Sequence, residues 1–119
     1  MSKEIPPSVQ QQLLRLQQLQ QTLSALLAEK QRLEAELVEI NSALEELEKM
    51  DEGAVVYKAV GPVLVRVSKE RLAVELKDKK ELTETRLKVL EKQDARMRAQ
   101  IESVQKDIQR LMSGQQAPS

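Results

Sequence analysis

The sequence of 119 residues contains no cysteine, no histidine, no tryptophan and no phenylalanine, and it has a single tyrosine. Without cysteine the chain can form neither a disulfide framework nor a thiolate nucleophile, and without histidine it also lacks the other common ligand of a zinc site. Histidine is the commonest general base in enzymes as well. We therefore expect no enzyme activity, no metal site and no cofactor.

Aromatic residues make up only 1% of the chain, whereas charged residues make up 32%. A compact globular core normally depends on aromatic side chains, so this composition favours the burial of leucine along helical stripes. The 19 Lys and Arg balance the 19 Asp and Glu. These charges are interspersed along the chain and form no basic block that would neutralise a run of phosphates, so we expect no nucleic-acid partner.

Long apolar runs are missing too. No stretch approaches the roughly 20 residues that a membrane-spanning helix needs, and the first residues, MSKEIPPSVQQQ, lack the apolar core of a signal peptide. We therefore expect a soluble, cytoplasmic protein with no membrane partner.

Apolar residues repeat at alternating spacings of three and four from about residue 7 to about residue 51. Ten of the twelve seam positions are apolar over six heptads, more than the roughly three or four heptads that indicate a coiled coil. The predicted seam of this first helix consists of Val9, Leu16, Leu23, Lys30, Leu37 and Leu44, alternating with Gln12, Leu19, Leu26, Leu33, Ile40 and Leu47.

A second stretch, from about residue 68 to about residue 113, repeats the pattern with nine apolar positions out of twelve. Ser68 is its predicted N-cap, and Glu70 lies in the first turn, where the helix dipole favours an acidic residue. Gly53 and Gly114 are the predicted stop signals of the two helices. The second seam consists of Ala73, Lys80, Leu87, Asp94, Ile101 and Ile108, alternating with Leu76, Thr83, Leu90, Met97, Val104 and Leu111.

Two helices of similar length, joined by a compact middle segment, favour an antiparallel coiled-coil hairpin. The pattern allows several neighbouring registers, and in one of them Leu33 faces Leu87. Lys30 and Asp94 then lie within about one layer of each other, where an ion pair would help to fix the register. The alternative, in which both side chains extend to water, stays open at this point.

The middle segment reads EGAVVYKAVGPVLVRVSKE, from Glu52 to Glu70. Two valine-rich runs separated by Gly61 and Pro62 predict a β-hairpin over about residues 54–67. Pro62 breaks any helix that would pass through this point. The sequence leaves the type of the turn open.

This predicted hairpin cannot bury its own apolar side chains. A two-stranded ribbon is marginal in water, and both of its edges are open. We therefore predict that other subunits supply the missing strands, while the alternative is a hairpin that only turns the chain, for which about two to eight residues would suffice. The predicted oligomerisation residues are Val55, Val56, Tyr57, Val60, Gly61, Pro62, Val63, Leu64, Val65 and Val67.

The segment VYKAVGPVLVRV between two coiled-coil arms resembles the β-type subunits of prefoldin, in an archaeal-like form, and the resemblance covers nearly the whole chain. One hairpin fits the β type, whereas the α-type subunits of the family have two. The resemblance implies a mostly α fold: a long antiparallel two-helix coiled coil with one central β-hairpin that joins an intersubunit β-barrel. It also implies an α2β4 hexamer of α-type partners and further copies of this chain. Such a hexamer binds unfolded polypeptides without ATP and delivers them to a group II chaperonin.

In such a protein the tips of the coiled coil are the free ends of the two helices. Apolar groups outside the seam at a fraying helix end are available to an unfolded chain, and methionine adapts to clients of varied shape. Some of the candidates are seam positions, for which ordinary packing is the alternative. The predicted client-binding residues are Ile5, Val9, Leu13, Leu14, Leu16, Val104, Ile108, Leu111 and Met112.

We expect a single domain over residues 1–119, with a first helix at about 7–51, the hairpin at about 54–67, a second helix at about 68–113 and a flexible tail at 114–119. The competing function is a structural coiled-coil scaffold or tether that has no client of its own. Oligomerisation through the hairpin is common to both hypotheses, so the residues at the tips distinguish them.

Overall fold

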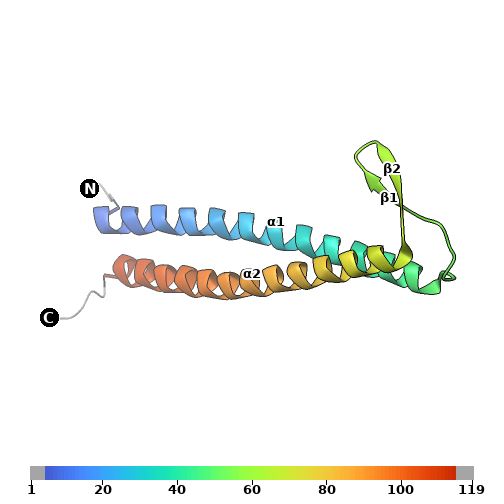
Figure 1. Cartoon of the computed structure of the whole chain (residues 1–119). Helices are drawn as coiled ribbons and strands as arrows, with labels where there is room; N and C mark the ends of the chain where they lie inside the picture. The colour runs from blue at the N-terminus through green and yellow to red at the C-terminus, as the bar shows by residue number, and fades with distance from the viewer. Residues whose placement is uncertain (1–4, 115–119) are drawn as a thin grey trace. The chain divides into compact units, whose positions relative to one another are not determined.

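The structure is a computed structural model that describes residues 5–114. Its elements follow one another as α1 (Pro7–Lys49), β1 (Val56–Val60), β2 (Val63–Val67) and α2 (Lys69–Met112) (Figure 1). The predicted fold of two long helices and one central β-hairpin is confirmed. The predicted tail beyond residue 114 lies outside the described residues.

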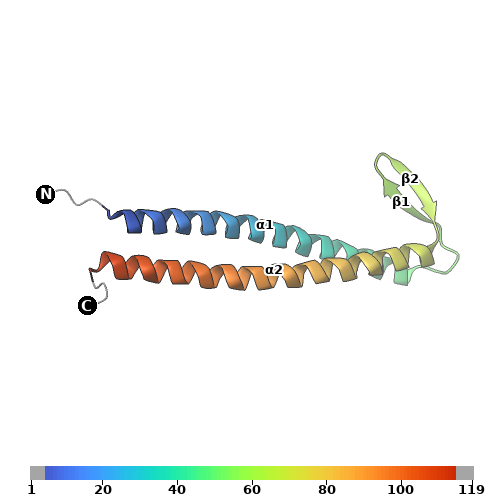
Figure 2. The same ribbon diagram turned by 60° about the vertical axis from the view of Figure 1, so that its left-hand side comes forward.

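The chain divides into two compact units, to which both helices contribute. We call residues 5–30 together with 89–114 the terminal unit, and residues 31–88 the hairpin unit. In each unit a segment of α1 lies beside a segment of α2 (Figure 2).

The helix ends follow local backbone rules. Pro7 is the first residue of α1, where its missing N–H costs nothing, and the Pro6 carbonyl accepts the first hydrogen bonds, from the N–H groups of Val9 and Gln10. Ser68 caps α2, because its Oγ accepts a hydrogen bond from the Arg71 N–H at 3.1 Å.

The first helix ends at Lys49, two residues before the predicted end. The Met50 carbonyl next to it accepts a hydrogen bond of 2.6 Å from the Nζ of Lys69 at the start of α2. A tight turn follows, in which the Ala54 N–H donates to the Asp51 carbonyl. The end of α1 is therefore stabilised by a residue from the other side of the hairpin.

The two strands are antiparallel, with Val56 opposite Val67 and Val60 opposite Val63. The loop between them is Gly61 and Pro62 alone. Gly61 has a φ of 58°, and Pro62 is not among the residues of positive φ. A positive φ at the first loop position followed by proline at the second corresponds to a type II′ turn, whose twist matches that of a hairpin.

We predict that Gly61→Ala destabilises the hairpin by about 1–2 kcal/mol, because an L-residue with a side chain is strained at this φ. Nothing lies within 4 Å of the place where a Cβ would stand, so the cost is conformational and not steric. The check is amide hydrogen exchange, which should become roughly tenfold faster in β1 and β2.

Gly53→Ala is the matched control. Gly53 also has open space around its Cβ position, but its φ is not positive. Exchange in the strands should then stay as in the parent chain. Equal exchange rates in the two variants would show that the left-handed backbone at Gly61 does not matter for the hairpin.

The core follows the predicted seams. In the hairpin unit Leu33 is 2% exposed, and in the terminal unit Val9 is 1% exposed. All but one of the buried residues are predicted seam positions, and the exception, Val56, belongs to β1: Val9, Leu33, Ile40, Leu47, Val56, Thr83, Leu87 and Val104. The heptad pattern therefore marks correctly where the helices meet within each unit.

Ion pairs between the helices agree with the predicted register. In the terminal unit Lys30 Nζ lies 3.9 Å from Asp94 Oδ2, and Asp94 also accepts a hydrogen bond of 2.6 Å from Arg98 Nε. In the hairpin unit Lys79 Nζ lies 3.5 Å from Glu36 Oε1. The predicted ion pair of Lys30 and Asp94 is thus confirmed.

Candidate functional site

The hairpin has apolar side chains on both of its faces. Residues opposite one another in an antiparallel pair share a face, and neighbours along a strand alternate between faces. One face, which we call the valine face, therefore consists of Val56, Lys58, Val60, Val63, Val65 and Val67. The other face consists of Tyr57, Ala59, Leu64 and Arg66.

Most of these apolar side chains are exposed in the single chain. Val56 is buried and Val67 is half-buried, whereas Leu64 near the turn is 69% exposed. Gly61 and Pro62 are exposed as well. The exposed apolar side chains on and beside the strands are Val55, Tyr57, Val60, Val63, Leu64 and Val65. Exposed apolar side chains gathered on one element mark an interaction surface in many proteins.

The backbone of the hairpin is also incomplete by itself. Within residues 5–114 the sheet has two strands, so each strand has one edge without a partner strand. Exposed edges of this kind are templates for pairing with another chain. All ten predicted oligomerisation residues lie on this one element or next to it, and all but Val56 remain at least partly accessible.

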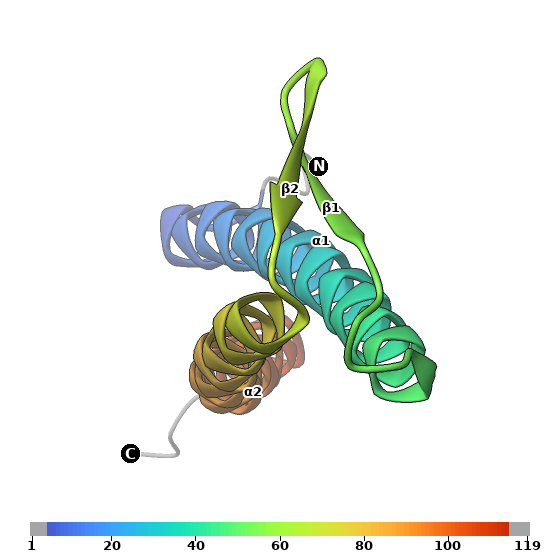
Figure 3. The ribbon, with the colours of Figure 1, turned by 45° about the vertical axis from the view of Figure 1, so that its right-hand side comes forward.

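Polar contacts orient the base of the hairpin within the hairpin unit. Lys58, from the valine face, forms an ion pair with Glu75 of α2. The Nζ of Lys69 donates a hydrogen bond to the Met50 carbonyl. Val56, the first residue of β1, is buried. Figure 3 shows the strands rising from the ends of the two helical segments of this unit. The base is therefore held by the helices, and the half near the turn stays accessible.

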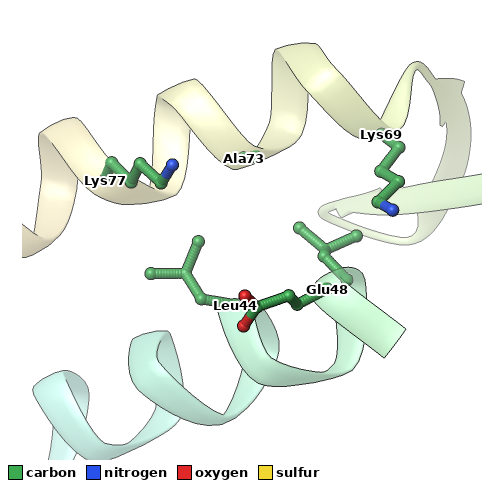
Figure 4. Close-up of a pocket in the computed structure, with 6 residues that line it drawn as sticks. Leu44, Glu48, Lys69, Ala73 and Lys77 are labelled. Carbon is green, nitrogen blue, oxygen red and sulfur yellow. The ribbon is translucent and has the colours of Figure 1, made fainter. Parts of the chain in front are cut away.

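A shallow hollow of about 290 Å³ lies between α1 and α2 near the hairpin. Leu44 and Glu48 line one side, and Lys69, Ala73 and Lys77 line the other (Figure 4). It forms because Ala73 occupies a seam position with only a methyl group. Its polar lining side chains are Glu48, Lys69 and Lys77.

Two other kinds of site can be assessed in the part of the chain that the structure describes. No group of three or more His, Cys, Asp or Glu residues in it is placed to hold a metal ion. Neither of its two helices has an apolar stretch of the length that crossing a membrane requires.

The second candidate surface lies at the helix ends in the terminal unit. Ile5, Leu13 and Leu14 near the start of α1, and Met112 at the end of α2, are exposed. Leu14 is the most exposed of them, at 61%. These four residues, which we call the tip residues, lie outside the seam and are apolar groups at the surface.

The other five predicted client-binding residues are less accessible. Val9 is 1% exposed and Val104 is 5% exposed, so both are buried in the seam of the terminal unit. Leu16, Ile108 and Leu111 are half-buried. The structure therefore brings the nine residues into one unit but separates them into an exposed group and a group that packs.

Sequence reasoning missed two features. Gln12, assigned only to the seam, has a side-chain Oε1 that is buried and has no hydrogen-bond partner. In addition, Val38, Val74 and Leu82 of the hairpin unit are exposed outside the seam. The heptad pattern contains the signal for these three, because each is an apolar residue at a non-seam position.

The chain was compared with known proteins. The family model for prefoldin subunits matches residues 10–115. The prefoldin subunit beta of Sulfurisphaera tokodaii is 43% identical over 113 residues, which cover 95% of this chain and 90% of the relative. That of Archaeoglobus fulgidus is 44% identical over 112 residues, which cover 94% of this chain and 97% of the relative.

A solved structure is also similar to this chain. The crystal structure of the prefoldin beta subunit from Thermococcus strain KS-1 superposes with a TM-score of 0.83 at 37% sequence identity. The match covers 98% of this chain and 100% of the crystallised chain. The similarity therefore extends over both helices and the hairpin.

Proposed function

The chain belongs to the prefoldin subunit family, a family of chaperones, and on this basis we propose that it is a holdase subunit that captures unfolded polypeptides without ATP. Its partners in this proposal are an α-type subunit and further copies of itself in an α2β4 hexamer. The hexamer passes its clients to a group II chaperonin in the cytoplasm. The family membership also confirms the resemblance seen in the segment VYKAVGPVLVRV.

The hairpin supports the assembly part of the proposal. Its two open edges offer hydrogen bonds to neighbouring strands, and its exposed valines lose contact with water when those strands cover them. An isolated two-stranded hairpin is marginal in water, whereas three or more strands with an apolar face are stable. The hairpin therefore gains most of its stability from other subunits.

The observation that carries the holdase proposal is the exposure of the four tip residues, Ile5, Leu13, Leu14 and Met112. They are aliphatic side chains at the ends of both helices, and Met112 in particular adapts to clients of varied shape. Each contact buries little area and is weak. Several arms that hold one client gain affinity from multivalency and still release it.

The test is a light-scattering aggregation assay with a chemically unfolded client and no ATP. The assembled complex should suppress aggregation in proportion to its concentration. A variant with Ile5→Ser, Leu13→Ser, Leu14→Ser and Met112→Ser should need roughly tenfold more complex for the same suppression, since loss of the weak contacts on each arm lowers the avidity. Gel filtration should still report the parent assembly.

The control removes exposed apolar side chains elsewhere. Val38→Ser, Val74→Ser and Leu82→Ser alter three exposed apolar residues of the hairpin unit and should leave suppression unchanged. If a well-assembled parent complex suppresses no aggregation, the holdase proposal is wrong and a scaffold or tether remains. If both variants lose suppression equally, the tip residues have no special role.

A further inference from the structure

The end of α1 and the turn that follows it are acidic. Between residues 45 and 52 the chain has five acidic residues and one basic residue, Lys49, which forms an ion pair with Glu46. The other four acidic side chains are exposed, and none of them has an ion-pair partner within residues 5–114. We call these four residues the acidic end: Glu45, Glu48, Asp51 and Glu52.

A basic groove of about 500 Å³ lies in the same unit, where β2 continues into α2. Lys58, Arg66 and Arg71 contribute its basic side chains, and Glu75 contributes a carboxylate. Glu75 already forms an ion pair with Lys58. Arg66 and Arg71 are exposed, and neither guanidinium group has an ion-pair partner among the described residues. The groove therefore has an excess of positive charge.

Both clusters lie at a helix end where the helix dipole disfavours their charge. The C-terminal end of a helix has a partial negative charge, and the N-terminal end has a partial positive charge. The acidic end surrounds the C-terminus of α1 at Lys49, and Arg71 lies near the start of α2, next to Glu70, whose charge is the favoured one. Neither cluster therefore stabilises its own helix, and opposite charge from another chain would stabilise both.

Strand pairing by itself does not determine which neighbour the hairpin binds. The N–H and C=O groups at an open edge are the same in every strand, so such an edge can pair with many chains. Complementary charges across an interface disfavour wrong partners and fix the register of the right one. The groove contains Lys58 of β1 and Arg66 of β2, so it is continuous with the surface that the strands offer to other subunits.

We propose that the basic groove binds the acidic end of a second copy of this chain, and that this contact selects the neighbour with which the hairpin pairs. The inference rests on the assembly part of the proposed function and deepens it. The two surfaces differ, so the contact is heterologous: one copy binds the acidic end of the next, and its own acidic end binds a third chain. Asp51 and Glu52 of one copy then lie against Arg66 and Arg71 of its neighbour.

The test reverses the two charge clusters separately in the complex formed with the α-type partner. One variant has Arg66→Glu and Arg71→Glu, and the other has Asp51→Lys and Glu52→Lys. Like charges then meet at the contact, so the concentration at which half of the complex dissociates should rise roughly tenfold or more in low salt. Sodium chloride should reduce this difference from the parent, because it screens exposed charges. Analytical ultracentrifugation measures the dissociation, and circular dichroism should show the helix content of the parent.

Combining the two reversals should restore assembly. A mixture of the two variants, or a single chain with all four substitutions, brings opposite charges together again, so dissociation should return to within about threefold of the parent. Lys92→Glu with Arg96→Glu is the matched control. It makes the same change of charge at two exposed residues of α2 in the terminal unit and should leave assembly unchanged.

The outcomes separate the inference from the proposed assembly. Weaker association of each variant, with recovery in the combination, supports the inference. Weaker association without recovery overturns it, because the groove then binds another partner, such as the α-type subunit, or only maintains the base of the hairpin. Unchanged association of both variants also overturns it, because strand pairing then suffices. A parent chain that forms no complex with its copies and the α-type partner refutes the proposed assembly itself.

Discussion

Val60→Asp is expected to abolish assembly while the chain keeps its helices. Val60 lies beside the turn on the valine face and is 53% exposed in the single chain, so the change costs the isolated chain little. In a shared sheet the same position is covered by other subunits. A carboxylate buried there without a partner costs several kcal/mol, so association should weaken by about a hundredfold or more. Gel filtration with the α-type partner, alongside circular dichroism, measures both effects.

Val38→Asp is the control for this prediction. Val38 is 65% exposed on α1, so the same substitution is made at a similarly exposed position outside the hairpin. The complex should then form as with the parent chain. Normal assembly of Val60→Asp would mean that the hairpin only turns the chain and that another surface joins the subunits.

Leu33→Ala is expected to cost about 2–5 kcal/mol of stability, because it leaves a cavity in the seam as well as losing buried apolar surface. Leu33 is 2% exposed and belongs to the hairpin unit. Chemical unfolding followed by circular dichroism measures the effect. The protein concentration must be the same for all variants, since assembly contributes to the apparent stability.

Leu82→Ala removes the same atoms from a side chain of the same unit that is 51% exposed. Its effect should stay within about 0.5 kcal/mol, as for most surface substitutions. A similar loss in the two variants would contradict the assignment of Leu33 to the core. It would also place Leu82 at a contact that the single chain does not contain.

Much of the fold could be predicted from the sequence because the heptad pattern is local. Leu33, Ile40 and Leu87 occupy predicted seam positions, and all three are buried. The break between the strands falls at Gly61 and Pro62, where two residues with restricted backbones meet the valine-rich runs. Periodicity and turn chemistry depend only on neighbours along the chain, so they can be interpreted without coordinates.

The remaining features depend on contacts between distant residues. The end of α1 at Lys49 coincides with the bond from Lys69 to the Met50 carbonyl, which no local signal predicts. The turn type followed from Pro62 only once the loop was known to contain two residues. At the tips, Val9 and Leu14 were predicted as one surface, but the first is buried and the second exposed, because only one of them lies in the seam.

The two-residue turn at Gly61 and Pro62 also means that the contacts nearest to it close the shortest loops in the chain. Strand pairing joins residues that are close in sequence, so it forms within microseconds. Met50 and Lys69 are separated by fewer residues than Glu36 and Lys79, while Lys30 and Asp94 must close a longer loop at a slightly greater entropic cost. We therefore expect contacts between the helical segments to form first near the hairpin and last near the chain ends. During synthesis, α1 therefore cannot pair with α2 along its full length until most of α2 has left the ribosome.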